Sequence, residues 1–188
     1  MEKPKTYLTP EEYLDIERKA EFKSEYFNGE MFALAGTSKE HNIIAGNLIA
    51  VLKSQLREKS CEVFFSELRV RVPSTSLYTY PDIIVVCGEQ KFEDKEFDTL
   101  LNPTLIIEIL SESTESYDRG KKFENYLQFE SLQEYVLVSQ KQVRIEKYLR
   151  QDKGKWLFGE ERNLEKVIEL PSIKCSFPLR EVYRNINF

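Results

Sequence analysis

The sequence predicts an α/β fold in which helices flank a mixed sheet, and three observations indicate this class. Two nearly continuous apolar runs, 83–87 and 104–110, are typical of central strands covered on both faces. Apolar residues at helical spacing predict a long amphipathic helix over 38–58. The order of elements lacks the regular alternation and the glycine-rich loop of a doubly wound fold, which favours a mixed sheet.

Local signals predict the other elements in order. Thr9, Pro10 and Glu12 form a capping box with proline at the first helical position, so a helix is expected to run to about Ala20. Asn28-Gly29 is a strong hairpin signal and separates two short predicted strands. Further strands are expected at 61–65, 68–72, 134–139, 143–149, 156–158 and 167–170. Helices are expected at 116–129 and 178–183, and loops at 73–79 and 89–102.

Length and charge set bounds on organisation and partners. The 188 residues suit a single domain spanning 1–188, because domains commonly contain roughly 100–200 residues. The net charge of −5 argues against nucleic-acid binding by bulk charge, although it leaves room for a local basic patch or an acidic metal site.

The cysteines and the hydropathy pattern indicate a reducing compartment. Cys61, Cys87 and Cys175 are isolated, so neither a zinc site nor a disulfide is expected, and Cys87 is interpreted as a buried small hydrophobe. No apolar stretch approaches the roughly 20 residues that span a bilayer, and Met1–Lys5 lead into no signal-peptide core. A cytoplasmic protein without membrane contact is the expectation.

Two carboxylates interrupt the two most apolar strands. Asp82 follows Pro81 at the start of the first run, and Glu108 lies between Ile107 and Ile109 in the second. A carboxylate in such a strand is costly unless it is paired or binds a metal. If the strands are neighbours, the two acids form a hard oxygen site for Mg²⁺ or Mn²⁺, which suits phosphodiester hydrolysis.

A positive charge from the next helix would complete this site. Lys122 comes four residues after Asp118, so the two share a helix face, and a lysine can orient water or neutralise developing phosphate charge. Each residue also has an ordinary structural interpretation. Asp82 suits a turn, Glu108 a solvated edge strand, and Lys121 with Lys122 an exposed helix face. The conjunction of all three in order favours the metal site.

The motifs, taken together, resemble the Uma-two family, a group of endonucleases within the PD-(D/E)XK superfamily. The resemblance extends from Thr9 to Leu179, nearly the whole chain. Its marks are Asn28-Gly29-Glu30, Glu40-His41-Asn42, Phe65-Ser66-Glu67-Leu68-Arg69-Val70, Tyr80-Pro81-Asp82, Val85–Gly88, Pro103, Glu108–Ser111, Ser113-Thr114, Tyr117–Gly120, Lys122-Phe123 with Tyr126, and Ser131–Tyr135. The resemblance implies a restriction-endonuclease-like mixed sheet with an N-terminal helix and hairpin.

The resemblance also implies roles for individual residues. Asp82 and Glu108 match the two acids, whereas the usual lysine position holds Leu110 and Lys122 takes its place from the following helix. Asp82, Glu108 and the main-chain oxygen of Ile109 would bind one Mg²⁺ or Mn²⁺. A further acid near the N-terminal helices is implied, with Glu30 and Glu40 as candidates. Asp118 is a further candidate beside Lys122.

Four other residues each have both a functional and an ordinary structural interpretation. His41, the only histidine, is a general base, a phosphate contact or a polar residue near the Ser38 cap, and we favour the last. Arg69 and Arg71 share one strand face and either contact phosphates or pair with surface acids. Lys121 is a candidate phosphate contact beside Lys122, although its side chain points about 100° away on an ideal helix.

The predicted function is therefore metal-dependent hydrolysis of DNA, with RNA left open as a substrate. By analogy, a homodimer that cuts two strands is expected. One rival is a catalytically inactive module that keeps the fold and binds nucleic acid or protein. A second rival is a structural protein in which Glu108 merely pairs with Lys122.

Overall fold

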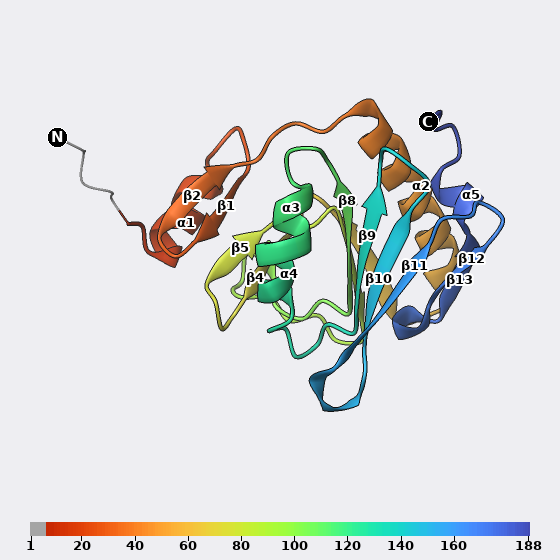
Figure 1. Ribbon diagram of the computed structural model, residues 1–188. Coiled ribbons are helices and arrows are strands. Elements are labelled where there is room, and N and C mark those ends of the chain that lie inside the picture. Colours follow the sequence, from red (N-terminus) through yellow and green to blue (C-terminus); the bar gives the residue numbers. More distant parts are fainter. Residues whose placement is uncertain (1–6) are drawn as a thin grey trace.

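A computed structural model describes residues 7–188, and its centre is a six-stranded mixed sheet (Figure 1). The strand order is β11-β10-β9-β8-β6-β3, and only β8 and β9 run parallel. The bounds are β3 Cys61–Phe65, β6 Ile83–Cys87, β8 Leu105–Leu110, β9 Glu134–Ser139, β10 Ile145–Arg150 and β11 Trp156–Glu161. The mixed α/β architecture predicted from the sequence is confirmed.

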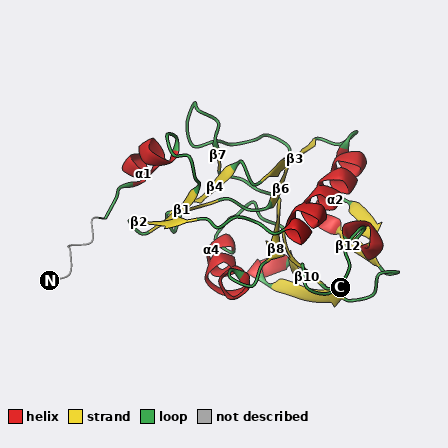
Figure 2. Cartoon of the chain, turned by 90° about the horizontal axis from the view of Figure 1, so that it is seen from above, coloured by secondary structure: helices red, strands yellow, loops and turns green. Residues whose placement is uncertain are grey.

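Helices cover both faces of this sheet, as Figure 2 shows in the view from above. The long helix α2 (Lys39–Leu56) packs on one face, where Ile83, Ile107 and Ile109 are buried. The opposite face holds Ile84, Ile106 and Tyr126 in a second core. On that second face lie α3 (Glu115–Tyr117), a π-helical turn (Asp118–Lys122) and α4 (Phe123–Tyr126). The alternation along β8 therefore decides which side chains reach which helix.

The N-terminal elements form a second sheet beside the first. It has five strands in the order β2-β1-β5-β4-β7, and α1 packs against it. Their bounds are α1 Pro10–Glu17, β1 Ser24–Phe27, β2 Glu30–Ala33, β4 Arg69–Val72, β5 Leu77–Thr79 and β7 Thr99–Leu100. Tyr13, Tyr26 and Tyr78 are buried together and fix the hairpin to β5.

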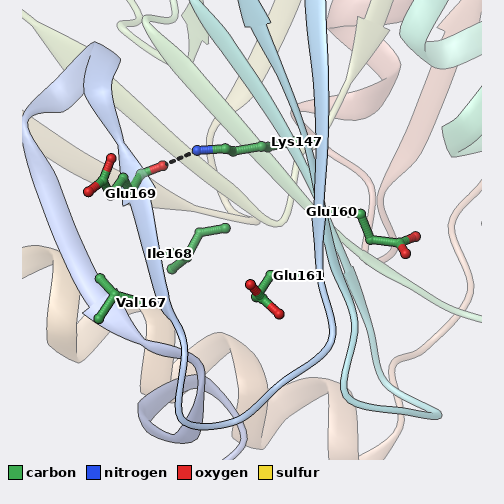
Figure 3. A pocket seen from close by; sticks show the side chains of 7 residues that line it. Lys147, Glu160, Glu161, Val167, Ile168 and Glu169 are labelled. Atoms are coloured by element: carbon green, nitrogen blue, oxygen red, sulfur yellow. Dashed lines mark hydrogen bonds between the residues drawn. The ribbon is translucent and has the colours of Figure 1, made fainter.

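The C-terminal strands β12 (Val167–Leu170) and β13 (Cys175–Pro178) form an antiparallel pair on the α2 side, followed by α5 (Leu179–Val182). Figure 3 shows a hollow between this pair and the edge of the large sheet, where Lys147 donates from Nζ to the main-chain oxygen of Glu169 at 2.6 Å. This contact ties β10 to β12. None of the acids, bases or cations predicted to be functional lines this hollow.

Several predicted boundaries are wrong, for reasons of long-range pairing. The expected loop 73–79 contains β5, and the expected loop 89–102 contains β7, because each segment pairs with β4. The single helix expected at 116–129 is divided by the π-helical turn and ends at Tyr126, and the first helix ends at Glu17 rather than near Ala20. Strand β13 was not predicted, because it exists only through pairing with β12.

The expectation of no disulfide is also wrong. Cys61 and Cys87 form a disulfide between β3 and β6, and only Cys175 remains free and buried. The two residues are direct partners in the antiparallel register, with their Cα atoms 4.0 Å apart. Their separation of 26 residues in sequence carries no hint of this register.

Within residues 7–188, no helix has the length and apolar character needed to cross a membrane. The expectation about a signal peptide falls on Met1–Lys5, which lie outside the described residues.

Candidate active site

Asp82 directly precedes β6 and follows Pro81. Its Oδ2 accepts a hydrogen bond from the main-chain N–H of Ile109 at 2.7 Å. Its Oδ1 lies 3.1 Å from Nε2 of His41 on α2. Antiparallel pairing of Ile83 with Ile107 brings the two strands together at this point. The Asp82 carboxylate therefore connects the main chain of β8 to His41 on α2.

Glu108 lies in the middle of β8 and faces the opposite side, toward α4. Its Oε2 accepts the N–H of Asp82 at 3.3 Å, and its Oε1 accepts the hydroxyl of Tyr126 at 2.8 Å. Burial is the main cause that raises the pKa of Glu108 to about 8, and the carboxylates of Asp118 and Asp82 add to it, while Lys122 opposes the rise. The structure thus places the Glu108 carboxylate beside the main chain of Asp82.

Lys122 comes from the π-helical turn, a feature often found at functional sites. Its Nζ lies 2.9 Å from Oε1 of Glu108 and 3.5 Å from Oδ1 of Asp118. Burial disfavours the charged amine, but Glu108, Glu25 and Asp118 outweigh burial and raise the pKa of Lys122 well above its usual value. The amine is therefore a buried cation at neutral pH. It pairs with Glu108, an arrangement that is compatible with both the predicted site and the structural rival.

Glu25 on β1 is a member of this cluster that the sequence did not reveal. Its Oε1 lies 3.4 Å from Nζ of Lys122, and it accepts the hydroxyl of Thr79. Burial and the nearby Glu25 raise the pKa of Tyr117, which also hydrogen-bonds to Glu25. The only sequence signal was an acid inside a short strand. Which acid reaches the site depends on the pairing of β1 with β5.

The two acids proposed from the sequence occupy other positions. Glu30 is the first residue of β2, paired in register with Phe27 beyond the hairpin turn. Glu40 is in the first turn of α2, directly before His41. Because successive side chains on a helix diverge by about 100°, the direction of His41 toward Asp82 is not shared by Glu40. Geometry favours Glu25 as the N-terminal acid.

His41 lies at the start of α2, as the favoured interpretation predicted, and also contacts Asp82. Its main-chain N–H donates to Oγ of the N-cap Ser38 at 3.0 Å, as expected for a residue at a helix start. Its ring is nevertheless buried, and Nε2 reaches Asp82. The histidine is therefore part of the site as well as of the helix cap.

The arginines of β4, which were expected either to contact phosphates or to pair with acids, are both paired with acids. Arg69 is 3% exposed, and its guanidinium binds Asp98 at 2.9 Å and Tyr80 at 2.8 Å. Arg71 is half-buried and pairs with Glu93. The ion-pair interpretation therefore holds, because carboxylates already neutralise both cations. Lys121 is exposed and remains a candidate phosphate contact.

The donor set fits a hard divalent cation. Asp82 and Glu108 come from neighbouring segments of the sheet: Oε2 of Glu108 lies 3.3 Å from the main-chain nitrogen of Asp82, and the N–H of Ile109 donates to Oδ2 of Asp82. Because the N–H and C=O of one strand residue point to the same side of the strand, the main-chain oxygen of Ile109 faces the same side as its N–H, which donates to Asp82. Within residues 7–188, no cluster of three or more His, Cys, Asp or Glu side chains has metal-binding geometry. Mg²⁺ commonly takes one or two carboxylates and fills its other positions with water and phosphate oxygens.

Comparison with known proteins gives one family. The model of the Uma2 family, described as "Putative restriction endonuclease", matches residues 10–179. The uncharacterized protein slr1290 of Synechocystis sp. is 39% identical over 181 residues, which are 96% of this chain and 94% of that protein. A second Synechocystis protein, sll1609, is 37% identical over 153 residues, covering 81% of this chain and 86% of the relative.

A solved structure has the same fold. A crystal structure from Anabaena variabilis ATCC 29413, described as a "putative nuclease belonging to DUF820", superposes with a TM-score of 0.74 at 20% identity. The superposition covers 94% of this chain and 97% of that one. The likeness shows a shared overall fold.

Proposed function

We propose, from the premise that this chain belongs to the Uma2 family, that it is a divalent-metal-dependent endonuclease that hydrolyses DNA phosphodiester bonds. The coarser part of this statement, a nuclease, is supported by the description of the family and of the structural neighbour. The metal dependence and the residue roles rest on one observation: the carboxylate of Glu108 contacts both the main-chain nitrogen of Asp82 and Nζ of Lys122, which come from separate segments.

In this proposal, Asp82, Glu108 and the main-chain oxygen of Ile109 hold Mg²⁺ or Mn²⁺. When bound, the ion would polarise the phosphoryl group and acidify a water. The protein groups keep this site in shape: Tyr126 donates to Oε1 of Glu108, and the N–H of Ile109 fixes Oδ2 of Asp82. Carboxylates whose orientation is fixed before the substrate binds need little reorganisation during the reaction.

Lys122 would act on the phosphate. Its amine has three protons, and Glu108, Glu25 and Asp118 hold the nitrogen at one place. The amine is thereby positioned to orient the attacking water or to neutralise charge on the phosphate. His41, in contact with Oδ1 of Asp82, would steady that carboxylate from the α2 side.

Plasmid cleavage tests the proposal. Purified protein with supercoiled DNA and Mg²⁺ or Mn²⁺ should give nicked and linear products, and EDTA should abolish them. Asp82→Asn and Glu108→Gln should each lower the rate by at least about 100-fold, because loss of the metal removes several kcal/mol of transition-state stabilisation. The exposed Asp152→Asn, prepared in parallel, controls for contaminating nucleases. Equal cleavage by all three variants would overturn the assignment, and so would metal-independent cleavage.

The rival interpretation, an inactive module with the same fold, makes the opposite prediction. For this module, calorimetry should detect no Mn²⁺ binding that is lost in Asp82→Asn. The module should also cleave no DNA under any condition. Labelled RNA of matching sequence, used in the same assay, separates DNA from RNA as the substrate.

Cutting both strands of a duplex calls for two sites, so we also expect a homodimer. The cytoplasmic location expected from unpaired cysteines loses that support, because Cys61 and Cys87 are joined. Analytical ultracentrifugation of the wild-type chain, with and without DNA, tests the dimer.

A further inference from the structure

A hollow of about 250 Å³ opens beside Asp82 on the α2 side of the large sheet. One wall comes from the first turns of α2 and the other from the end of β3. His41 and Asp82 also line it, so it is continuous with the candidate active site. Its remaining lining combines an aromatic ring, aliphatic groups and small polar groups, mainly Asn42, Ala45, Gly46, Ile49, Phe65 and Ser66.

Phe65 provides the aromatic wall. It is the last residue of β3 and pairs in register with Ile83, the residue after Asp82. Ile83 packs on the α2 side, so Phe65 also points to that side and into the hollow. Phe65 is 46% exposed, so its side chain is accessible from the hollow that it lines.

Gly46 lies on the opposite wall of the hollow, where it contributes no side chain. It lies inside α2, where glycine is less favourable than alanine, and its backbone is ordinary helix. A Cβ built there would meet no atom within 4 Å, so packing does not require a glycine. Because Gly46 lines the hollow, the effect of its missing side chain is to leave space there.

We propose that this hollow takes an unpaired nucleobase of the substrate strand, stacked on Phe65 beside the phosphate at Asp82. The inference rests on the proposed nuclease function, because Asp82 belongs to both sites. The amide nitrogen of Asn42 donates to Thr37 at 2.9 Å and to the main-chain oxygen of Ser38 at 2.9 Å. This arrangement leaves the amide oxygen of Asn42 as an acceptor for an amino group on the base edge.

The charge distribution supports binding through a base rather than through phosphates. The chain carries a net charge of −5, and both arginines of β4 are neutralised by carboxylates. Binding by counterion release is therefore weak, whereas stacking on an aromatic ring does not require a basic surface. The hollow in Figure 3, lined by Glu160, Glu161 and Glu169, would instead repel the negatively charged backbone of a nucleic-acid strand.

A base that is paired and stacked in a duplex cannot enter the hollow, so single-stranded or locally unpaired DNA should bind better than duplex DNA. Fluorescence anisotropy of a labelled oligonucleotide, alone or annealed to its complement, measures this preference. Ca²⁺ replaces Mg²⁺ during the titration, and a gel shows that the oligonucleotide stays intact. A 2-aminopurine base in the strand reports stacking through quenching of its fluorescence.

Three variants test the hollow. Phe65→Leu should weaken single-strand binding by about tenfold and remove the quenching, whereas Phe65→Trp should keep both, since base–aromatic stacking typically accounts for factors of this size. Gly46→Leu, which suits a helix, should fill the hollow and weaken binding likewise. Phe158→Leu is the matched control, because Phe158 is 51% exposed on β11, the opposite edge of the same sheet.

The outcomes separate the two proposals. Wild-type binding and quenching in Phe65→Leu and Gly46→Leu would overturn the base site, and so would a preference for duplex DNA. If the plasmid is still cut in a manner that depends on Asp82, the nuclease proposal survives that result. If the variants lose base binding but the wild-type protein never cuts DNA, the base site stands and the nuclease proposal fails.

Discussion

The ammonium nitrogen of Lys122 lies 2.9 Å from Oε1 of Glu108, and the two side chains are only 7% and 3% exposed. In such a buried pair, removal of either partner leaves an uncompensated charge in a poorly solvated place. The pair therefore links the proposed chemistry to the stability of the fold. Variants at these positions need both an activity and a stability measurement.

Lys122→Met should lower both quantities. It leaves Glu108, Glu25 and Asp118 without their shared cation, so the free energy of unfolding at neutral pH should fall by about 3–5 kcal/mol. The cleavage rate of the folded fraction should fall by about 100-fold or more. Urea denaturation and plasmid cleavage measure the two effects. Lys121→Met, on the exposed neighbour, should keep wild-type stability; an equal loss there would contradict the special position of Lys122.

Glu25→Gln should identify which N-terminal acid belongs to the site. The amide keeps the size of the side chain but removes a negative charge 3.4 Å from Nζ of Lys122. We expect a cleavage rate about tenfold lower, because the amine is less firmly positioned. Glu30→Gln and Glu40→Gln, measured alongside, should cut at nearly the wild-type rate. A larger effect at either of these positions would restore the original candidates.

Reduction of the Cys61–Cys87 disulfide should destabilise the protein. The bond closes a loop with a sequence separation of 26 residues, for which the chain-entropy estimate is roughly 3 kcal/mol. Urea denaturation with and without dithiothreitol measures the difference. Thiol titration of the denatured protein should find Cys175 alone before reduction and all three cysteines afterwards. Three reactive thiols in the unreduced protein would show that β3 and β6 are not joined.

Glu134 gives a pH-dependent test away from the active site. Burial raises its pKa, while hydrogen bonds from Ser172 oppose the rise. A group with a raised pKa in the folded state favours folding at pH values below its unfolded pKa, and this contribution is lost as the pH rises through the folded pKa. Glu134→Gln should therefore be more stable than the wild type at pH 8, with a smaller difference near pH 4. Urea midpoints at the two pH values measure it, and a constant difference would refute the explanation.

The segments of the candidate site could be predicted from the sequence because their signals are local. A carboxylate inside an apolar strand is costly, so Asp82 and Glu108 stood out without any knowledge of the fold. Lys122 required its spacing from Asp118 and the resemblance to a family. The central strands and α2 were predictable from their apolar patterns for the same local reason.

The missed features all depend on partners distant in sequence. Glu25 reaches Lys122 only because β1 pairs with β5, and β5 itself is a three-residue strand inside a stretch that reads as loop. Arg69 alternates with valines along β4, a pattern typical of a surface residue. It is nevertheless buried, because its guanidinium pairs with Asp98 and donates to Tyr80. The Cys61–Cys87 disulfide likewise follows from strand register, which no spacing rule encodes.

The most direct test of the account is a crystal of the wild-type protein soaked with Mn²⁺ and measured at the manganese absorption edge. We predict an anomalous peak bounded by the carboxylates of Asp82 and Glu108 and the main-chain oxygen of Ile109. The peak should be absent in Asp82→Asn crystals treated in the same way. A peak elsewhere on the molecule, with none between these two acids, would contradict the proposal that they form a metal site.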